Sequence, residues 1–128
     1  MTKLSIAIAV AATLGAPLLA RAQEVVPDAL SVEWQGKKPC ENLHEDAQIR
    51  ILRCTFPPKA MHLRHQHPAN FVYVLSGGKV EARAAGGAVQ VVSDTDAYAF
   101  SPPIPWHEAT NTGDTTLRYI VVEMKYQR

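Results

Sequence analysis

Turn-forming residues interrupt this chain at short intervals, and they limit its possible folds more than any other feature. From residue 57 onwards, clusters of proline, glycine and asparagine separate short runs rich in β-branched and aromatic residues. Helical periodicity is almost absent from these runs. Short strands at this spacing favour an antiparallel sandwich or barrel. The turn clusters are Pro57-Pro58, Gly77-Gly78, Gly86-Gly87, Pro102-Pro103 and Asn111-Thr112-Gly113-Asp114.

The runs between these turns predict an all-β domain. Residues 79–84 alternate between charged and apolar side chains, so one face of this strand is expected to meet water and the other the core. Residues 71–75 and 120–122 are apolar on both faces, which is typical of central strands. The polar residues 41–48 are expected to form a surface loop. The predicted strands are Leu30 to Trp34, Ile49 to Phe56, Met61 to His65, Phe71 to Leu75, Lys79 to Ala84, Ala88 to Val92, Ala97 to Ser101, His107 to Asn111 and Thr116 to Lys125.

Residues 1–22 have the pattern of a secretory signal peptide. Lys3 supplies the positive start, an apolar run follows, and Ala20-Arg21-Ala22 forms a small-x-small cleavage site. A retained membrane anchor is the alternative, but the apolar run is at the short limit for spanning a bilayer, and Gly15 and Pro17 interrupt it. We therefore expect a periplasmic or secreted protein with no membrane partner after cleavage.

Cleavage after residue 22 leaves 106 of the 128 residues, enough for one small domain. We divide it into an N-terminal arm with the first strand over residues 23–47 and a barrel over residues 48–126. Cleavage removes two of the 13 basic residues and none of the 12 acidic ones, so the formal charge moves from +1 to −1. A near-neutral domain without a basic block argues against nucleic acid as a partner and leaves small molecules, metals and proteins.

Cys40 and Cys54 are the two cysteines of the chain. In an oxidising compartment, a disulfide between them would stabilise the fold by roughly 3 kcal/mol. The alternative is a buried Cys54 and a free surface thiol at Cys40. We favour the disulfide, because an exposed free thiol is a liability outside the cytosol. Two cysteines alone form no structural zinc site.

The histidines are concentrated in a way that indicates a metal site. His65 and His67 are two residues apart, so on a strand they leave the same face. His107 reaches them only if a second strand folds across the first. Neutral imidazole is a common ligand of transition metals, and three imidazoles suit Zn, Cu, Ni or Fe. The alternative is a polar pocket lined by histidines that binds no metal.

Two motifs around these histidines resemble those of the cupin superfamily, small antiparallel barrels of the double-stranded β-helix type. The first cupin motif is H-x-H, three or four residues, Glu, six residues and Gly, and it matches the segment from His65 to Gly77. The second is Pro-x-Gly-x-x-His-x-x-x-Asn, and the segment from Pro102 to Asn111 matches it except at Ile104, which stands where the Gly is expected. The resemblance spans about residues 50–125. It implies a jelly-roll barrel whose metal ion is bound by the two His and the Glu of the first motif and the His of the second.

The chain departs from the family pattern at the acidic ligand. Carried over residue by residue, the resemblance implies the ligands His65, His67, His107 and Asn70, and Asn70 stands where the Glu is expected. It keeps the distance to Gly77 but lies one residue too close to His67. An amide oxygen is neutral and a weaker donor than a carboxylate, so the site loses its anionic ligand.

His62 allows more than one interpretation. His62 lies three residues before His65 and has the wrong strand parity to share its face, so we expect it at the rim or the surface. A bulge in the strand could instead make His62 a ligand or a proton shuttle.

Tyr73 is expected to point out of the barrel, where it could line an interface. We expect the chain to form a homodimer.

The expected function is that of an exported cupin whose histidine-based metal centre acts on or binds a small polar or carboxylate molecule. The metal would be Zn, Cu, Ni, Fe or Mn, and the chemistry of the oxygenase, isomerase or lyase type. One alternative is a non-catalytic module that captures a metal ion or a small ligand, and another is a metal-free barrel that serves in protein interaction. Without the Glu, the usual carboxylate ligand or base is missing, which favours a binding role over a catalytic one. Arg53, Arg64 and Arg83 could hold an anionic substrate, but charged side chains on strands usually face water.

Overall fold

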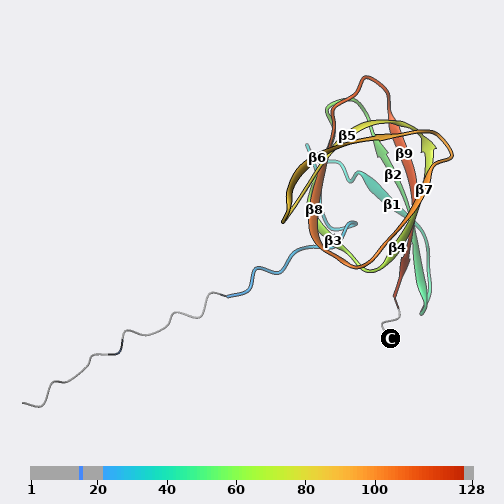
Figure 1. Cartoon of the computed structure of the whole chain (residues 1–128). Helices are drawn as coiled ribbons and strands as arrows, with labels where there is room; N and C mark the ends of the chain where they lie inside the picture. Colours follow the sequence, from blue (N-terminus) through green and yellow to red (C-terminus); the bar gives the residue numbers. More distant parts are fainter. Residues whose placement is uncertain (1–14, 16–21, 126–128) are drawn as a thin grey trace, which may run out of the picture.

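The computed structural model describes Gly15 and residues 22–125, and it is an all-β barrel (Figure 1). The strands are β1 (Cys40–Glu45), β2 (Ile49–Phe56), β3 (Met61–His67), β4 (Asn70–Ser76), β5 (Gly78–Ala84), β6 (Gly87–Ser93), β7 (Tyr98–Ser101), β8 (Ile104–Asn111) and β9 (Leu117–Met124). They form two antiparallel sheets, one with the order β1-β2-β9-β4-β7 and one with the order β3-β8-β5-β6. The all-β architecture predicted from the turn spacing is confirmed for the described residues.

The core lies between the two sheets and is built by alternate residues of the long strands. Leu52 and Phe56 of β2 are buried, and so are Leu117 and Val121 of β9. β2 and β9 are paired over all eight residues of each, with Leu52 opposite Val121, so their inward side chains meet in register. Because side chains alternate along a strand, each strand contributes every second residue to this core.

The first strand is not where the sequence predicted it. Residues 30–34, predicted to be a strand, form turns and irregular backbone flanked by isolated bridges. The first strand among the described residues is β1, inside the polar stretch that was expected to be a loop. β1 is an edge strand and exposes every side chain except Cys40, so polar residues suit it. Its pairing with β2 defines this strand, and a search for apolar alternation misses such a strand.

The N-terminal arm runs along the free edge of β3. Asp28 forms a parallel bridge with Gln66, whose backbone N–H donates to the Pro27 carbonyl oxygen at 2.8 Å. The Gln66 side-chain amide donates to the Val26 carbonyl oxygen, also at 2.8 Å. Apart from Gly15 and Ala22, the predicted signal peptide over residues 1–22 lies outside the described residues. Within the described part, the chain has no helix of the length and apolarity that crossing a membrane requires.

The predicted disulfide between Cys40 and Cys54 is present. It joins directly opposite positions of β1 and β2, and both residues are buried. The Cys40 sulfur lies 3.9 Å from Nδ1 of His62, so the disulfide packs against the histidine-rich strand of the other sheet. The disulfide therefore links the edge strand β1 covalently to β2 at a buried position of the barrel.

Asn111, at the end of β8, ties three chain segments together. Its side-chain amide donates to the carbonyl oxygens of Phe56 and Thr115, both at 2.8 Å, and its Oδ1 accepts the Gly113 N–H at 2.9 Å. The residue is 2% exposed. These bonds satisfy carbonyl groups that water does not reach easily, so the amide holds the turn after β8 against the end of β2.

We predict that Asn111→Ala lowers the free energy of unfolding by about 2–4 kcal/mol, because three hydrogen bonds are lost and buried groups are left unpaired. Urea denaturation followed by circular dichroism measures this change. Asn42→Ala is the matched control, since Asn42 is exposed and donates one bond, to Glu45. Its expected effect is within about 0.5 kcal/mol. Equal losses for the two variants would contradict the role given to Asn111.

Candidate metal centre

Three of the four predicted ligands come together at one point inside the barrel. His65 and His67 are on β3, and His107 is on β8 directly opposite His65 in the register. One ligand nitrogen from each of the three lies within 4.8 Å of the others. His65 is fully buried and His67 is 8% exposed. The prediction that a second strand brings His107 to the paired histidines is confirmed.

The hydrogen bonds of His65 and His67 define which nitrogen of each ring is free. Nδ1 of His65 donates to the Leu63 carbonyl oxygen at 2.6 Å, because a carbonyl can only accept. Nδ1 of His67 donates to the Glu123 carboxylate, also at 2.6 Å. In the neutral rings the lone pairs are therefore on the two Nε2 atoms, which face each other at 3.0 Å. Two facing lone pairs repel, so a cation between them stabilises this arrangement.

His107 completes the set. Its Nε2 is buried and is the one such side-chain atom without a hydrogen-bond partner among the described residues. Nitrogens bound to one ion at about 2.1 Å lie about 3.0–3.4 Å apart, and the 3.0 Å between the two facing Nε2 atoms is in this range. The separations within the cluster extend to 4.8 Å, so a ring has to turn inward for all three nitrogens to bind one ion. Three neutral imidazoles are donors that first-row transition metals favour. The residues present therefore fit a transition-metal ion.

Burial keeps these rings in the form that binds metal. Desolvation lowers the pKa of His65 to about 2 and that of His107 to about 4, and the neighbouring histidines add to both shifts. Both rings are consequently neutral at the pH of most biological fluids. Protons therefore compete weakly with a metal ion for them.

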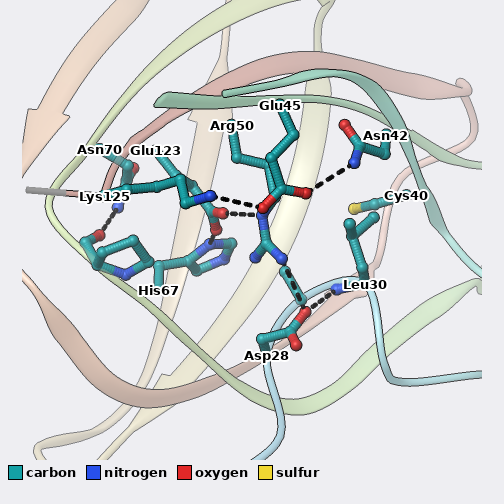
Figure 2. A network of polar contacts seen from close by, with 12 residues as sticks. Asp28, Leu30, Cys40, Asn42, Glu45, Arg50, His67, Asn70, Glu123 and Lys125 are labelled. Carbon is teal, nitrogen blue, oxygen red and sulfur yellow. Dashed lines mark hydrogen bonds and ion pairs between the residues drawn. The ribbon is translucent and has the colours of Figure 1, made fainter. Parts of the chain in front are cut away.

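A residue that the sequence interpretation missed, Glu123, supplies the negative charge of the centre. Its carboxylate is 1% exposed and accepts hydrogen bonds from Nδ1 of His67 and from Nε of Arg50, both at 2.6 Å (Figure 2). Burial opposes its ionisation, but the bonds from His67 and Arg50 outweigh burial and lower the pKa of the carboxyl. Arg50 in turn reaches Asp28 of the N-terminal arm at 3.4 Å. A carboxylate behind a histidine fixes the tautomer and raises the basicity of the metal-binding nitrogen.

Strand parity is the signal that could have found Glu123. Leu117 and Val121 of β9 point inward, so the residue two positions after Val121 also points inward, and an acid there requires a partner. Glu123 is opposite Asn70 in the pairing of β4 with β9. The site thus has an amide where the resemblance implies an acid, and an acid on the adjacent strand.

Asn70 is buried and lines the same cavity as the three histidines. Its side-chain amide donates to the Pro68 carbonyl oxygen at 3.0 Å. This bond uses the NH₂ group and leaves the amide oxygen as the atom that can act as a ligand. Its place in the ligand set stays a prediction.

The prediction that His62 lies at the rim or surface is wrong. His62 is 3% exposed, because the pairing of β3 with β8 is irregular between His62 and His65 and the extra residue returns His62 to the inward face. Its ring stacks on that of His65 with centroids 3.5 Å apart. Its Nε2 donates to the Ala29 carbonyl oxygen at 2.9 Å, and its Nδ1 faces Cys40. His62 therefore packs against the ring of His65 at the wall of the cavity and lies outside the three-nitrogen cluster.

The histidines open onto a cavity of about 260 Å³. Its walls combine the histidines with apolar groups, and burial raises the pKa of the wall residue Tyr119 to about 12. No lysine or arginine is among its lining residues in the described chain. The three candidate arginines are engaged elsewhere: Arg53 with Glu41, Arg64 with Glu24 and the Trp106 ring, and Arg83 with Glu81 and Glu108.

We predict that the metal-free protein loses stability as the pH falls from 7 to 5. In the fold, burial lowers the pKa of His62 to about 4, as it does for His107, against 6.5 in the unfolded chain. Below pH 6.5 these histidines bind protons in the unfolded chain but stay neutral in the native state. The free energy of unfolding therefore falls by up to roughly 2 kcal/mol per histidine at pH 5. Urea denaturation in the presence of a chelator measures the slope.

His62→Phe keeps an aromatic ring against His65 and should reduce this slope. Val92→Gln, at an exposed position of β6 without a titratable group, should leave it unchanged. A slope that is the same in the wild type and in His62→Phe would show that His62 is not held neutral by the fold.

The comparisons with known proteins agree with this geometry. A family model described as a cupin domain matches residues 52–123, more than half of the chain. The search of curated proteins finds no match.

Several solved structures share the fold at low identity. The chain is similar to a cupin domain from Bordetella pertussis Tohama I, with a TM-score of 0.64 and 17% identity over 81% of this chain and 100% of that chain. A conserved protein with a double-stranded β-helix domain from Klebsiella pneumoniae has a TM-score of 0.56 and 18% identity, over 75% of this chain and 84% of that chain. A cupin-like protein from Thermotoga maritima has a TM-score of 0.56 and 20% identity, over 67% of each chain. The predicted double-stranded β-helix fold is thus confirmed, and with the family match over residues 52–123 this chain belongs to the cupin family.

Proposed function

We propose that this cupin binds one divalent transition-metal ion through His65, His67 and His107 and accepts a small polar or carboxylate molecule beside it. The ion would be Zn, Cu, Ni, Fe or Mn, all of which accept imidazole ligands. The observation that supports this function best is the pair of Nε2 lone pairs facing each other at 3.0 Å. The unpartnered Nε2 of His107 beside them points to the same conclusion.

When bound, such an ion supplies a Lewis acid with open positions for oxygen donors. The protein's own groups then have separate tasks. Glu123 holds His67 in the tautomer whose Nε2 is free. Val72 and Val121 make part of the wall apolar and limit water. The Tyr119 hydroxyl keeps its proton, since its pKa is raised to about 12, and can donate a hydrogen bond to an oxygen of the bound molecule.

The cavity favours a small molecule that binds through the metal. Its volume of about 260 Å³ is at the lower end of small-molecule sites. Since no cationic side chain lines it among the described residues, a carboxylate would find its positive partner in the ion itself. An oxygenase, isomerase or lyase reaction at this site would begin with a small oxygen-bearing compound held in this way.

A non-catalytic role in capturing metal or ligand is the second candidate, and one observation favours it. Glu123 is the acid nearest the cluster, and it already accepts bonds from His67 and Arg50. No aspartate or glutamate lines the cavity among the described residues, so the site lacks a free carboxylate base. Oxygen-consumption and product assays on small carboxylates, with the metal-loaded protein, distinguish a catalyst from a binder.

We further propose that the protein works in the periplasm or outside the cell. The signal-peptide pattern of residues 1–22 and the buried Cys40–Cys54 disulfide support this location, because disulfides persist in oxidising compartments. Cell fractionation with an antibody to the barrel tests it.

We predict about one transition-metal ion per chain in protein purified without chelator. His65→Ala/His67→Ala should reduce the bound metal at least tenfold, because two of three imidazole donors are removed. Elemental analysis measures the content and identifies the ion. His44→Ala, at an exposed histidine outside the cluster, should retain the wild-type amount. Equal and negligible metal in the wild type and the double variant would refute the metal-based function.

We also predict that Glu123→Gln weakens metal binding by about 10–100-fold, because the orientation and basicity of His67 depend on this carboxylate. Competition with a chromogenic chelator measures the dissociation constant. Glu41→Gln is the control, since Glu41 is a surface carboxylate that also accepts a bond from an arginine, Arg53. Unchanged affinity in a folded Glu123→Gln protein would mean that the carboxylate does not tune the ligand.

A further inference from the structure

The inner face of the four-stranded sheet leads from the histidines to a strand that water reaches. Residues opposite each other in the register form one row across β3, β8, β5 and β6, namely His62, Ala109, Ala82 and Val89. The first member, His62, lines the cavity of the metal centre. We call the other three residues, Ala109, Ala82 and Val89, the apolar row.

Strand parity shows that the apolar row points into the barrel. Val80, two residues before Ala82 on β5, packs against the core cluster, so Ala82 shares its inward direction. Glu81, between them, is on the outward face, where the Gln90 side chain of β6 donates to its carboxylate at 3.1 Å. This part of the sheet therefore has polar residues outside and apolar residues inside, as is usual for antiparallel sheets.

The far end of the apolar row is nevertheless open to water. Val89 is 59% exposed, although its side chain points inward. Val91, the next inward residue of β6, is 38% exposed. The opposite sheet of a closed barrel would cover such valines, so the barrel is open beside β6. The metal cavity and this opening thus share one inner surface, with Ala109 and Ala82 between them.

The five-stranded sheet contributes a second row that begins at the same cavity. Val121 and Val72 line the cavity and are opposite each other in the register of β9 and β4. Ala99 of β7 is opposite Val72, and it is exposed. Every member of this row and of the apolar row is alanine or valine. Hydration of such a surface is unfavourable, so the surface suits an aliphatic group.

We infer that the ligand of this centre is an aliphatic carboxylate whose chain lies along the apolar row, an inference that rests on the proposed function. The carboxylate occupies the cavity at the ion, and the chain continues over Ala82 to Val89. Ala109 and Val89 are two strand spacings apart, which is about 10 Å. An extended chain advances about 1.3 Å per carbon, because C–C bonds are about 1.5 Å long, so roughly eight carbons reach Val89.

Isothermal titration calorimetry with acetate, butyrate, hexanoate and octanoate tests this inference on metal-loaded protein expressed from the full sequence. Each methylene removed from water tightens binding by up to about fourfold, so octanoate is expected to bind at least about 50-fold more tightly than acetate. Equal dissociation constants for acetate and octanoate would overturn the inference and leave the proposed function in place. Protein that holds no metal and binds neither ligand would refute the proposed function, and the inference with it.

The metal-site variant separates a seated ligand from a chain that adheres to the surface. His65→Ala/His67→Ala should lose the tight binding of octanoate, because the carboxylate then has no ion to bind. Octanoate binding that is unchanged in this variant would contradict the inference, since the head group would not be at the ion.

Two exposed valines of β6 provide matched variants. Val89 points inward, whereas Val92, 71% exposed, is opposite Lys79 on the outward face. Val89→Asp should weaken octanoate binding at least tenfold and leave acetate binding unchanged, because only the longer chain reaches this position. Val89→Leu should keep the wild-type affinity for octanoate to within a few-fold, and Val92→Asp should change the binding of neither ligand. Wild-type octanoate affinity in Val89→Asp, or an equal loss in Val92→Asp, would overturn the inference.

Discussion

One buried carboxylate, Glu123, connects the parts of this protein that matter for its site. It accepts a hydrogen bond from His67 on β3 and another from Arg50 on β2, while it is itself on β9. Arg50 extends the connection to Asp28 in the N-terminal arm. Removing one partner from such a buried set typically costs about 3–5 kcal/mol, because a charge is left without compensation. The sheet interior, the arm and the metal centre are therefore energetically coupled through a single side chain.

The proposed metal centre would keep a negative charge near the ion without using it as a ligand. Asn70 and Glu123 face each other on adjacent strands, so the amide and the acid occupy neighbouring inward positions. A carboxylate bound directly to the ion would lower the net charge of the site and fill a coordination position. A carboxylate behind His67 offsets the charge of the ion through an imidazole and leaves that position to another donor. This arrangement favours a site whose open positions are available to oxygen donors.

Much of this could be predicted from the sequence, since it depends on local patterns. The turn clusters favoured a sandwich or barrel, and the two histidine motifs, through their resemblance to cupins, predicted the barrel and the three-histidine cluster. The two cysteines favoured the disulfide. The failures all involve long-range pairing. β1 is a strand because β2 offers it an edge, His62 is buried because β3 carries an extra residue opposite β8, and Glu123 belongs to the site because β9 lies beside β4. Periodicity within one segment does not predict these pairings. The inward position of Glu123 on β9 could nevertheless have indicated a buried acid with a partner.

The hydrogen bonds of the N-terminal arm have a consequence for how the protein can be handled. Within four residues, the carbonyl of Val26, the carbonyl of Pro27, the carboxylate of Asp28 and the carbonyl of Ala29 bind Gln66, Arg50 and His62. These contacts begin at residue 26, so this part of the arm packs behind the three-histidine cluster. A fusion or truncation that disturbs residues 26–29 therefore also disturbs the residues that support the cluster.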